Sequence, residues 1–83
     1  MNELETFAKF TLDNGGIWHE LERFENVGLY KSQTRRMNGR NYEYDSPVYQ
    51  VFDSGKRVFA STNYRQAYAK YKKTLEDTAN GYD

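Results

Sequence analysis

The sequence has no cysteine, a single proline and a single histidine in 83 residues, and its formal net charge is zero. Without cysteine, a disulfide framework, a cysteine zinc site and thiol catalysis are all excluded, and the chain suits a reducing compartment. No apolar run reaches the roughly 18–20 residues that span a bilayer. The acidic start at residues 1–5 lacks the basic end and apolar stretch of a signal peptide. We therefore expect a cytoplasmic protein without membrane contact.

Residue types that carry catalysis or bind metals are scarce. His19 stands beside the acids Glu20 and Glu22, but no nucleophile elbow or glycine-rich oxyanion loop accompanies it. A metal site would need further ligands at a defined spacing, and no glycine-rich phosphate loop is present. A hydrolase that uses His19 is therefore the least favoured function. We expect no enzymatic activity, no catalytic residue, no cofactor and no metal.

Charged residues balance overall but are unevenly distributed. Residues 1–26 contain two basic and six acidic side chains, whereas residues 27–40 contain four basic side chains and no acid. Such asymmetry is more informative than the total charge. The balance disfavours both an acidic DNA mimic and a strongly basic chromatin-type protein.

Aromatic side chains supply much of the apolar material, with five Phe, eight Tyr and one Trp. Each buried ring removes roughly 150–250 Å² from water, so a small core built from rings is feasible in a chain of this length. We expect one domain over residues 1–83, with little room for a deep catalytic cavity.

Capping residues and apolar spacing predict helices at both ends of the chain. The first runs from Glu3 to Asp13, with Asn2 as its cap and Glu5 completing a capping box. The last begins after Asn63. Its apolar stripe comprises Tyr64, Ala67, Tyr68, Tyr71 and Leu75. We expect the tail at 79–83 to fray.

Residues 17–25 fit either a helix or a strand. Read as a strand, Trp18 and Phe24 would share a face with two glutamates, whereas the apolar residues fall at helical spacing. This spacing favours a second short helix.

The middle of the chain has the pattern of antiparallel strands. Asn38-Gly39 is the strongest local signal and predicts a two-residue type I′ hairpin. The pairs it would form are Met37–Arg40, Arg35–Tyr42 and Gln33–Tyr44. Ser54-Gly55 predicts a second hairpin. Its expected pairs are Asp53–Lys56, Val51–Val58 and Tyr49–Ala60.

Together these elements predict an α+β fold. It would have one or two N-terminal helices, a three- to four-stranded antiparallel meander, and a C-terminal amphipathic helix packed on the sheet.

Basic and aromatic residues are interleaved between residues 31 and 44. In the predicted hairpin, one face would carry Lys31, Gln33, Arg35, Arg40, Tyr42 and Tyr44. Cationic groups neutralise phosphates and aromatic rings stack on bases, so such a face suits a nucleic acid. Arg36 would lie on the reverse face or at the tip. With the basic residues near the second turn and on the last helix, the predicted nucleic-acid-binding residues are Lys31, Arg35, Arg36, Arg40, Tyr42, Lys56, Arg57, Arg65, Lys70, Lys72 and Lys73.

A structural interpretation of the same residues stays open. Tyr42 and Tyr44 could be core tyrosines with basic side chains extending past them. A basic hairpin tip also protects a sheet edge from aggregation. The lysines at 70–73 would then be an ordinary solvated helix surface that favours the C-terminal dipole.

The order of helix, antiparallel strands and helix resembles the double-stranded RNA-binding domain. The resemblance implies contacts to phosphates across the minor groove, here from the Met37–Arg40 turn and the Asn63–Ala67 helix start. That family carries a KKxAK run at its helix start. This chain has Tyr64-Arg65-Gln66-Ala67-Tyr68 instead and keeps only Arg65 and Ala67 in kind. A helix at 17–25 would be a further departure.

In length, aromatic content and lack of cysteine, the chain also looks like the small accessory proteins of tailed bacteriophages. This resemblance implies a non-enzymatic RNA-binding protein of the host cytoplasm that inhibits or modulates a host defence enzyme, with RNA assisting. The alternative is a protein–protein inhibitor of a host enzyme, such as a toxin nuclease, without nucleic-acid contact. Tyrosine and arginine dominate both kinds of interface, and an exposed tyrosine face also predicts a homodimer.

Overall fold

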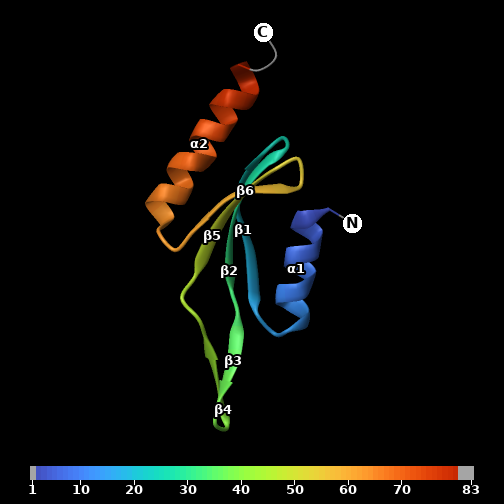
Figure 1. Cartoon of the computed structure of the whole chain (residues 1–83), viewed down its shortest axis with the longest axis vertical. Coiled ribbons are helices and arrows are strands. Elements are labelled where there is room, and N and C mark those ends of the chain that lie inside the picture. Colours follow the sequence, from blue (N-terminus) through green and yellow to red (C-terminus); the bar gives the residue numbers. More distant parts are fainter. Residues whose placement is uncertain (1, 81–83) are drawn as a thin grey trace.

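The computed structural model, which describes residues 2–80, has a four-stranded antiparallel sheet with one helix on each side (Figure 1). The elements are α1 (Glu3–Asp13), β1 (Ile17–Phe24), β2 (Val27–Gln33), β3 (Arg35–Asn38), β4 (Asn41–Tyr44), β5 (Val48–Asp53), β6 (Lys56–Ser61) and α2 (Tyr64–Asn80). The sheet order is β1-β2-β5-β6, and β3 pairs with β4 in a separate two-stranded ribbon. The predicted α+β class is confirmed, and α2 packs on the sheet as expected.

The side of the sheet that faces α2 holds the apolar core. Leu29 of β2 and Val51 of β5 are directly opposite each other and have no exposed surface. Ala67 and Tyr71 of α2 pack against them. The helix begins as predicted, because the Asn63 side-chain oxygen accepts a hydrogen bond from the Gln66 amide at 3.1 Å.

The side that faces α1 is aromatic and partly polar. Phe52 lies at the centre, with the rings of Phe7, Trp18 and Tyr30 within 6.1 Å between centroids. Asn2 caps α1 as predicted, its side-chain oxygen accepting from the Glu5 amide at 2.8 Å. The two helices therefore cover chemically different faces of one sheet.

Ile17–Phe24 form strand β1, so the second helix predicted at residues 17–25 is wrong. A bulge between Glu20 and Glu22 shifts the register against β2. Before it, Trp18 is opposite Ser32 on the α1 side; after it, Phe24 is opposite Val27 on the α2 side. The bulge thus sends the two rings to opposite faces, so that each ring shares its face with one glutamate and not with two.

Both predicted hairpins exist, but their registers differ from the predicted ones. In the first, Gly39 and Arg40 form the turn, so Met37 pairs with Tyr42 and Arg35 with Tyr44. Gly39 has a positive φ of 66° whereas Asn38 stays extended in the ladder, as in a turn with glycine at its first central position.

In the second hairpin the predicted pair Asp53–Lys56 is present. A bulge then shifts the register, so Val51 is opposite Phe59 and Tyr49 is opposite Ser61. The bulge directs the Phe59 ring toward the α2 core and leaves Val58 exposed.

Helix α2 continues through Asn80 and so includes the first two residues of the tail at 79–83, whose fraying stays a prediction. The rest of that tail, 81–83, lies outside the described residues.

Candidate nucleic-acid interface

The β3–β4 hairpin projects beyond the end of the sheet as a two-stranded arm (Figure 1). Every residue of its two strands is exposed. Thr34 joins the arm to the sheet: its carbonyl oxygen accepts a hydrogen bond from the Asp45 amide at 2.9 Å, and its hydroxyl donates to the Asp45 carboxylate at 2.9 Å. The antiparallel pairing of these two segments therefore continues across the break between β2 and β3.

The arm has two chemically different faces. The front face, as we call it, consists of Arg35, Met37, Tyr42 and Tyr44, because these residues form the cross-strand pairs Arg35–Tyr44 and Met37–Tyr42. The back face consists of Arg36, Asn38, Asn41 and Glu43. Aromatic rings, a thioether and a guanidinium thus lie on one side, and amides and an ion pair on the other.

Arg35 is held in place on the front face. Its guanidinium carbon lies 4.2 Å from the centre of the Tyr42 ring, a cation–π geometry. The guanidinium also lies so close to Gly15 that a Cβ there would collide with it. Gly15 has a φ of +79°, so this turn favours glycine on two grounds. The contact gives a cationic group with little freedom left to lose on binding.

Arg36 occupies the back face and is already paired with acids. Its guanidinium lies 3.3 Å from an Asp45 carboxylate oxygen and 3.7 Å from one of Glu43. Glu43 also accepts a hydrogen bond from the Asn38 side-chain amide at 2.8 Å. Among the predicted contacts, Arg36 is therefore the one whose charge is most fully balanced.

Arg40 lies in the turn at the tip of the arm rather than on the predicted face, because the turn comes one residue later than predicted and each partner on β4 lies two residues further along. Lys31 lies on β2 within the sheet, half-buried between His19 of β1 and Tyr49 of β5. Only Arg35, Tyr42 and Tyr44 of the predicted face share one side of the arm.

Lys56 and Arg57 lie at the far end of the sheet, by the β5–β6 turn. Lys56 is paired with Asp53 in the ladder. The Arg57 guanidinium stacks 4.6 Å from the Phe7 ring centre and donates to the Gln50 side-chain oxygen at 3.4 Å. Arg57 therefore helps attach α1 to the sheet and does not extend the arm.

The basic residues of α2 are spread around the helix. Arg65 is exposed in the first turn, and Lys73 is exposed further along. Lys70 is half-buried, whereas the Lys72 ammonium lies 5.9 Å from the Tyr68 ring centre. These four side chains do not form a single patch.

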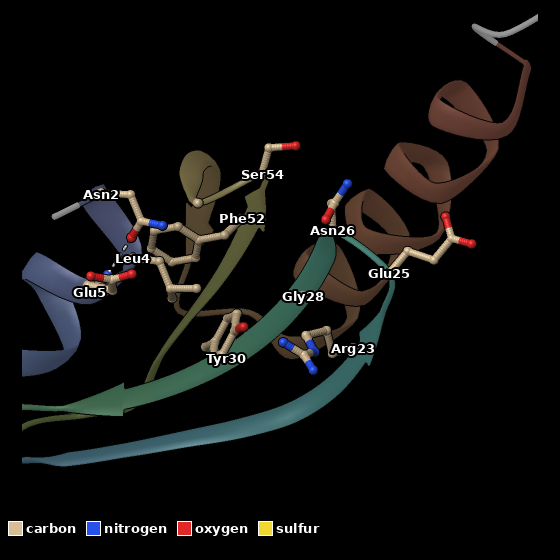
Figure 2. Close-up of a pocket in the computed structure, with 11 residues that line it drawn as sticks. Asn2, Leu4, Glu5, Arg23, Glu25, Asn26, Gly28, Tyr30, Phe52 and Ser54 are labelled. Atoms are coloured by element: carbon tan, nitrogen blue, oxygen red, sulfur yellow. Dashed lines mark hydrogen bonds between the residues drawn. The ribbon is translucent and has the colours of Figure 1, made fainter.

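A separate hollow of about 540 Å³ opens on the α1 side of the sheet. Figure 2 shows it between Leu4 of α1 and Arg23 at the end of β1, with Tyr30 and Phe52 in its floor. Burial raises the pKa of Tyr30, and the Glu20 carboxylate, which accepts a 3.4 Å hydrogen bond from its hydroxyl, raises that pKa further. Both floor rings are nearly fully buried, so they offer a ligand little apolar surface.

Potential metal ligands and the histidine are scattered over the part of the chain that the structure describes. Over residues 2–80, no group of three or more potential ligands could hold a metal ion. His19 is exposed on β1 and faces Lys31 across the ladder. Within the same range, no helix is long and apolar enough to cross a membrane.

No family model, no curated protein and no solved structure matches the chain. The chemistry of the arm therefore has to be argued from its own residues.

Proposed function

We propose that the protein is a non-enzymatic nucleic-acid-binding protein that contacts its ligand with the front face of the β3–β4 arm and with Arg40 at the tip. The observation that supports this most strongly is the segregation of charge. The acids Glu43 and Asp45 are paired with Arg36, whereas Arg35 shares its face with two exposed tyrosines.

The front face suits a nucleic acid because it offers both kinds of contact that a strand needs. The Arg35 guanidinium lies against Tyr42 and keeps N–H groups for phosphate oxygens. Tyr42 and Tyr44 are 58% and 49% exposed, so their rings are accessible to bases, and base stacking on such rings is tolerant of sequence. Arg40 at the tip adds a second cation.

The second candidate is a protein partner, such as a host enzyme if the protein is of the phage type. Met37 favours it, because this apolar residue is 65% exposed on the front face and lies directly opposite Tyr42. Methionine, tyrosine and arginine are all enriched at protein interfaces. The same exposed tyrosines underlie the predicted homodimer, which light scattering would test.

Salt dependence separates the two candidates. Each phosphate contact on a single strand contributes roughly 0.7 to the slope of log affinity against log salt. We expect the double variant Arg35→Ala/Arg40→Ala to reduce that slope by roughly 1.4, measured by fluorescence anisotropy with labelled oligouridine. Arg36→Ala is the matched control and should leave the slope unchanged, because its charge is balanced in the free protein.

If no RNA or DNA oligonucleotide bound at micromolar protein concentration, the nucleic-acid proposal would be ruled out. If a nuclease-treated preparation then formed a stoichiometric complex with one host protein, and Met37→Ala weakened that complex, the protein-partner candidate would be supported instead.

A further inference from the structure

The turn at the tip of the arm begins with an asparagine that is followed by a glycine. This dipeptide is chemically fragile, because glycine has no side chain to shield its backbone nitrogen from the side-chain amide before it. The chain contains three such pairs, Asn14-Gly15, Asn38-Gly39 and Asn80-Gly81. The last pair extends beyond the described residues, so the comparison that matters is between the first two.

The pair Asn14-Gly15 is held in place by the end of α1. The Gly15 amide donates to the Leu12 carbonyl oxygen at 3.0 Å, and the Asn14 side-chain amide donates to the Phe10 carbonyl oxygen at 2.7 Å. The Arg35 guanidinium also lies against Gly15. The backbone nitrogen and the side-chain amide of this pair therefore cannot approach each other unless the end of α1 opens.

The pair Asn38-Gly39 is exposed at the tip of the arm. A Cβ at Gly39 would meet no atom within 4 Å, and within residues 2–80 no backbone carbonyl accepts a hydrogen bond from the Gly39 amide. Asn38 is extended in the ladder, so it has to rotate before its side-chain carbon reaches the Gly39 nitrogen. That rotation requires only the Asn38–Asn41 pair to open, which costs little at the end of a two-stranded ribbon.

We propose that Asn38 is a self-modification site, at which the side-chain amide is lost without an enzyme and the arm gains a negative charge. The Gly39 nitrogen gives its proton to solvent and bonds to the Asn38 side-chain carbonyl carbon. The bond from that carbon to the amide nitrogen breaks, and the nitrogen takes up a proton and leaves as ammonia. One water molecule then opens the cyclic succinimide, giving aspartate or, when the other carbon–nitrogen bond breaks, isoaspartate.

The product alters the back face of the arm and leaves the front-face rings in place. The Asn38 amide donates to the Glu43 carboxylate at 2.8 Å, whereas a carboxylate at position 38 would repel it. Isoaspartate also lengthens the main chain by one atom, which disturbs the pairing with Asn41. Residues 35–44 contain three arginines and one acid, so a further negative charge weakens their attraction for phosphates. This last consequence rests on the proposed function.

The test follows the wild-type protein during incubation in mildly alkaline buffer, by peptide mapping with mass spectrometry. We expect Asn38 to lose its amide at least about tenfold faster than Asn14, because opening the tip needs less free energy than opening the end of α1. The rate should rise with pH, because the attacking nitrogen has to lose its proton. In guanidinium chloride the two sites should react at similar rates. Equal rates in the folded protein, or a difference that persists in guanidinium chloride, would overturn the proposal.

Two variants connect the modification with binding. Asn38→Gln keeps an amide but closes a ring far more slowly, because its side chain is one carbon longer. It should bind oligouridine as the fresh wild type does and keep that affinity during incubation. Asn38→Asp carries the charge of the product and should bind about twofold to fivefold more weakly, the size of a surface charge interaction, and high salt should remove the difference.

The outcomes separate the modification from the proposed function. Loss of the Asn38 amide in a protein that binds no oligonucleotide in any form would keep the modification site and overturn the proposed function. An Asn38 that stays intact in a protein that binds oligouridine would do the reverse. If Asn38→Asp and the incubated wild type both bound as tightly as the fresh wild type, the link between the modification and binding would be overturned.

Discussion

The sheet and the arm are two parts of one long ribbon that differ in what surrounds them. Within the sheet, Leu29 and Val51 lie opposite each other and are fully buried between neighbouring strands and α2. Beyond Thr34 the two central segments of the sheet continue as β3 and β4, where every residue is exposed. An isolated two-stranded ribbon is marginally stable in water, so the arm depends on the sheet for its stability. We infer that the sheet sets the stability of the protein and the arm is available for binding.

The largest expected effect comes from the centre of the sheet. Leu29→Ala should lower the free energy of unfolding by about 2–5 kcal/mol, because it leaves a cavity against Val51 and α2. Met37→Ala in the arm is the matched apolar change and should cost less than about 0.5 kcal/mol, as exposed substitutions do. Urea unfolding followed by Trp18 fluorescence would measure both, and equal losses would contradict the division between sheet and arm.

A smaller loss is expected from the polar cluster under α1. The Gln50 side chain is 5% exposed and donates to the Ser32 hydroxyl at 2.8 Å while accepting from Arg57 at 3.4 Å. Gln50→Ala should cost about 1–3 kcal/mol, because the buried Ser32 hydroxyl loses the amide that donates to it. The same urea titration would detect it, and an unchanged midpoint would mean that α1 contributes little to the cooperative unit.

The smallest effect is expected on the back face of the arm. Arg36 and its two acid partners are largely solvent-exposed, and such surface pairs contribute about 0–1 kcal/mol. Arg36→Ala should therefore shift the urea midpoint only slightly, and added salt should diminish the shift. A loss as large as that of Gln50→Ala would show that the base of the arm is part of the folded core.

Local signals predicted the ends of the elements well. The caps Asn2 and Asn63 and the start of both helices could be predicted because a cap needs only a side-chain oxygen and an amide three residues on. The Ser54-Gly55 turn was equally local, since both residues adopt positive φ.

Register and bulges could not be predicted from the sequence. The bulge near Leu21 places the Trp18 and Phe24 rings on opposite faces of the sheet. The bulge at Val58 directs the Phe59 ring toward the α2 core. Both serve contacts between residues that are far apart in the sequence. The arm shows the same limit: moving the turn by one residue takes Arg40 from a face to the tip. The neutralisation of Arg36 also depends on the register, because only the observed pairing places Arg36 opposite Glu43.

The most direct test of the account is to measure stability and oligouridine affinity on one sample of Tyr42→Ala/Tyr44→Ala. We predict a urea midpoint close to that of the wild type together with a loss of binding of at least tenfold, because both rings lie outside the core and on the front face. Two results would contradict the claim that the arm binds the ligand while the sheet provides the stability. One is a variant that binds oligouridine as tightly as the wild type, and the other is a variant that loses binding only because it unfolds.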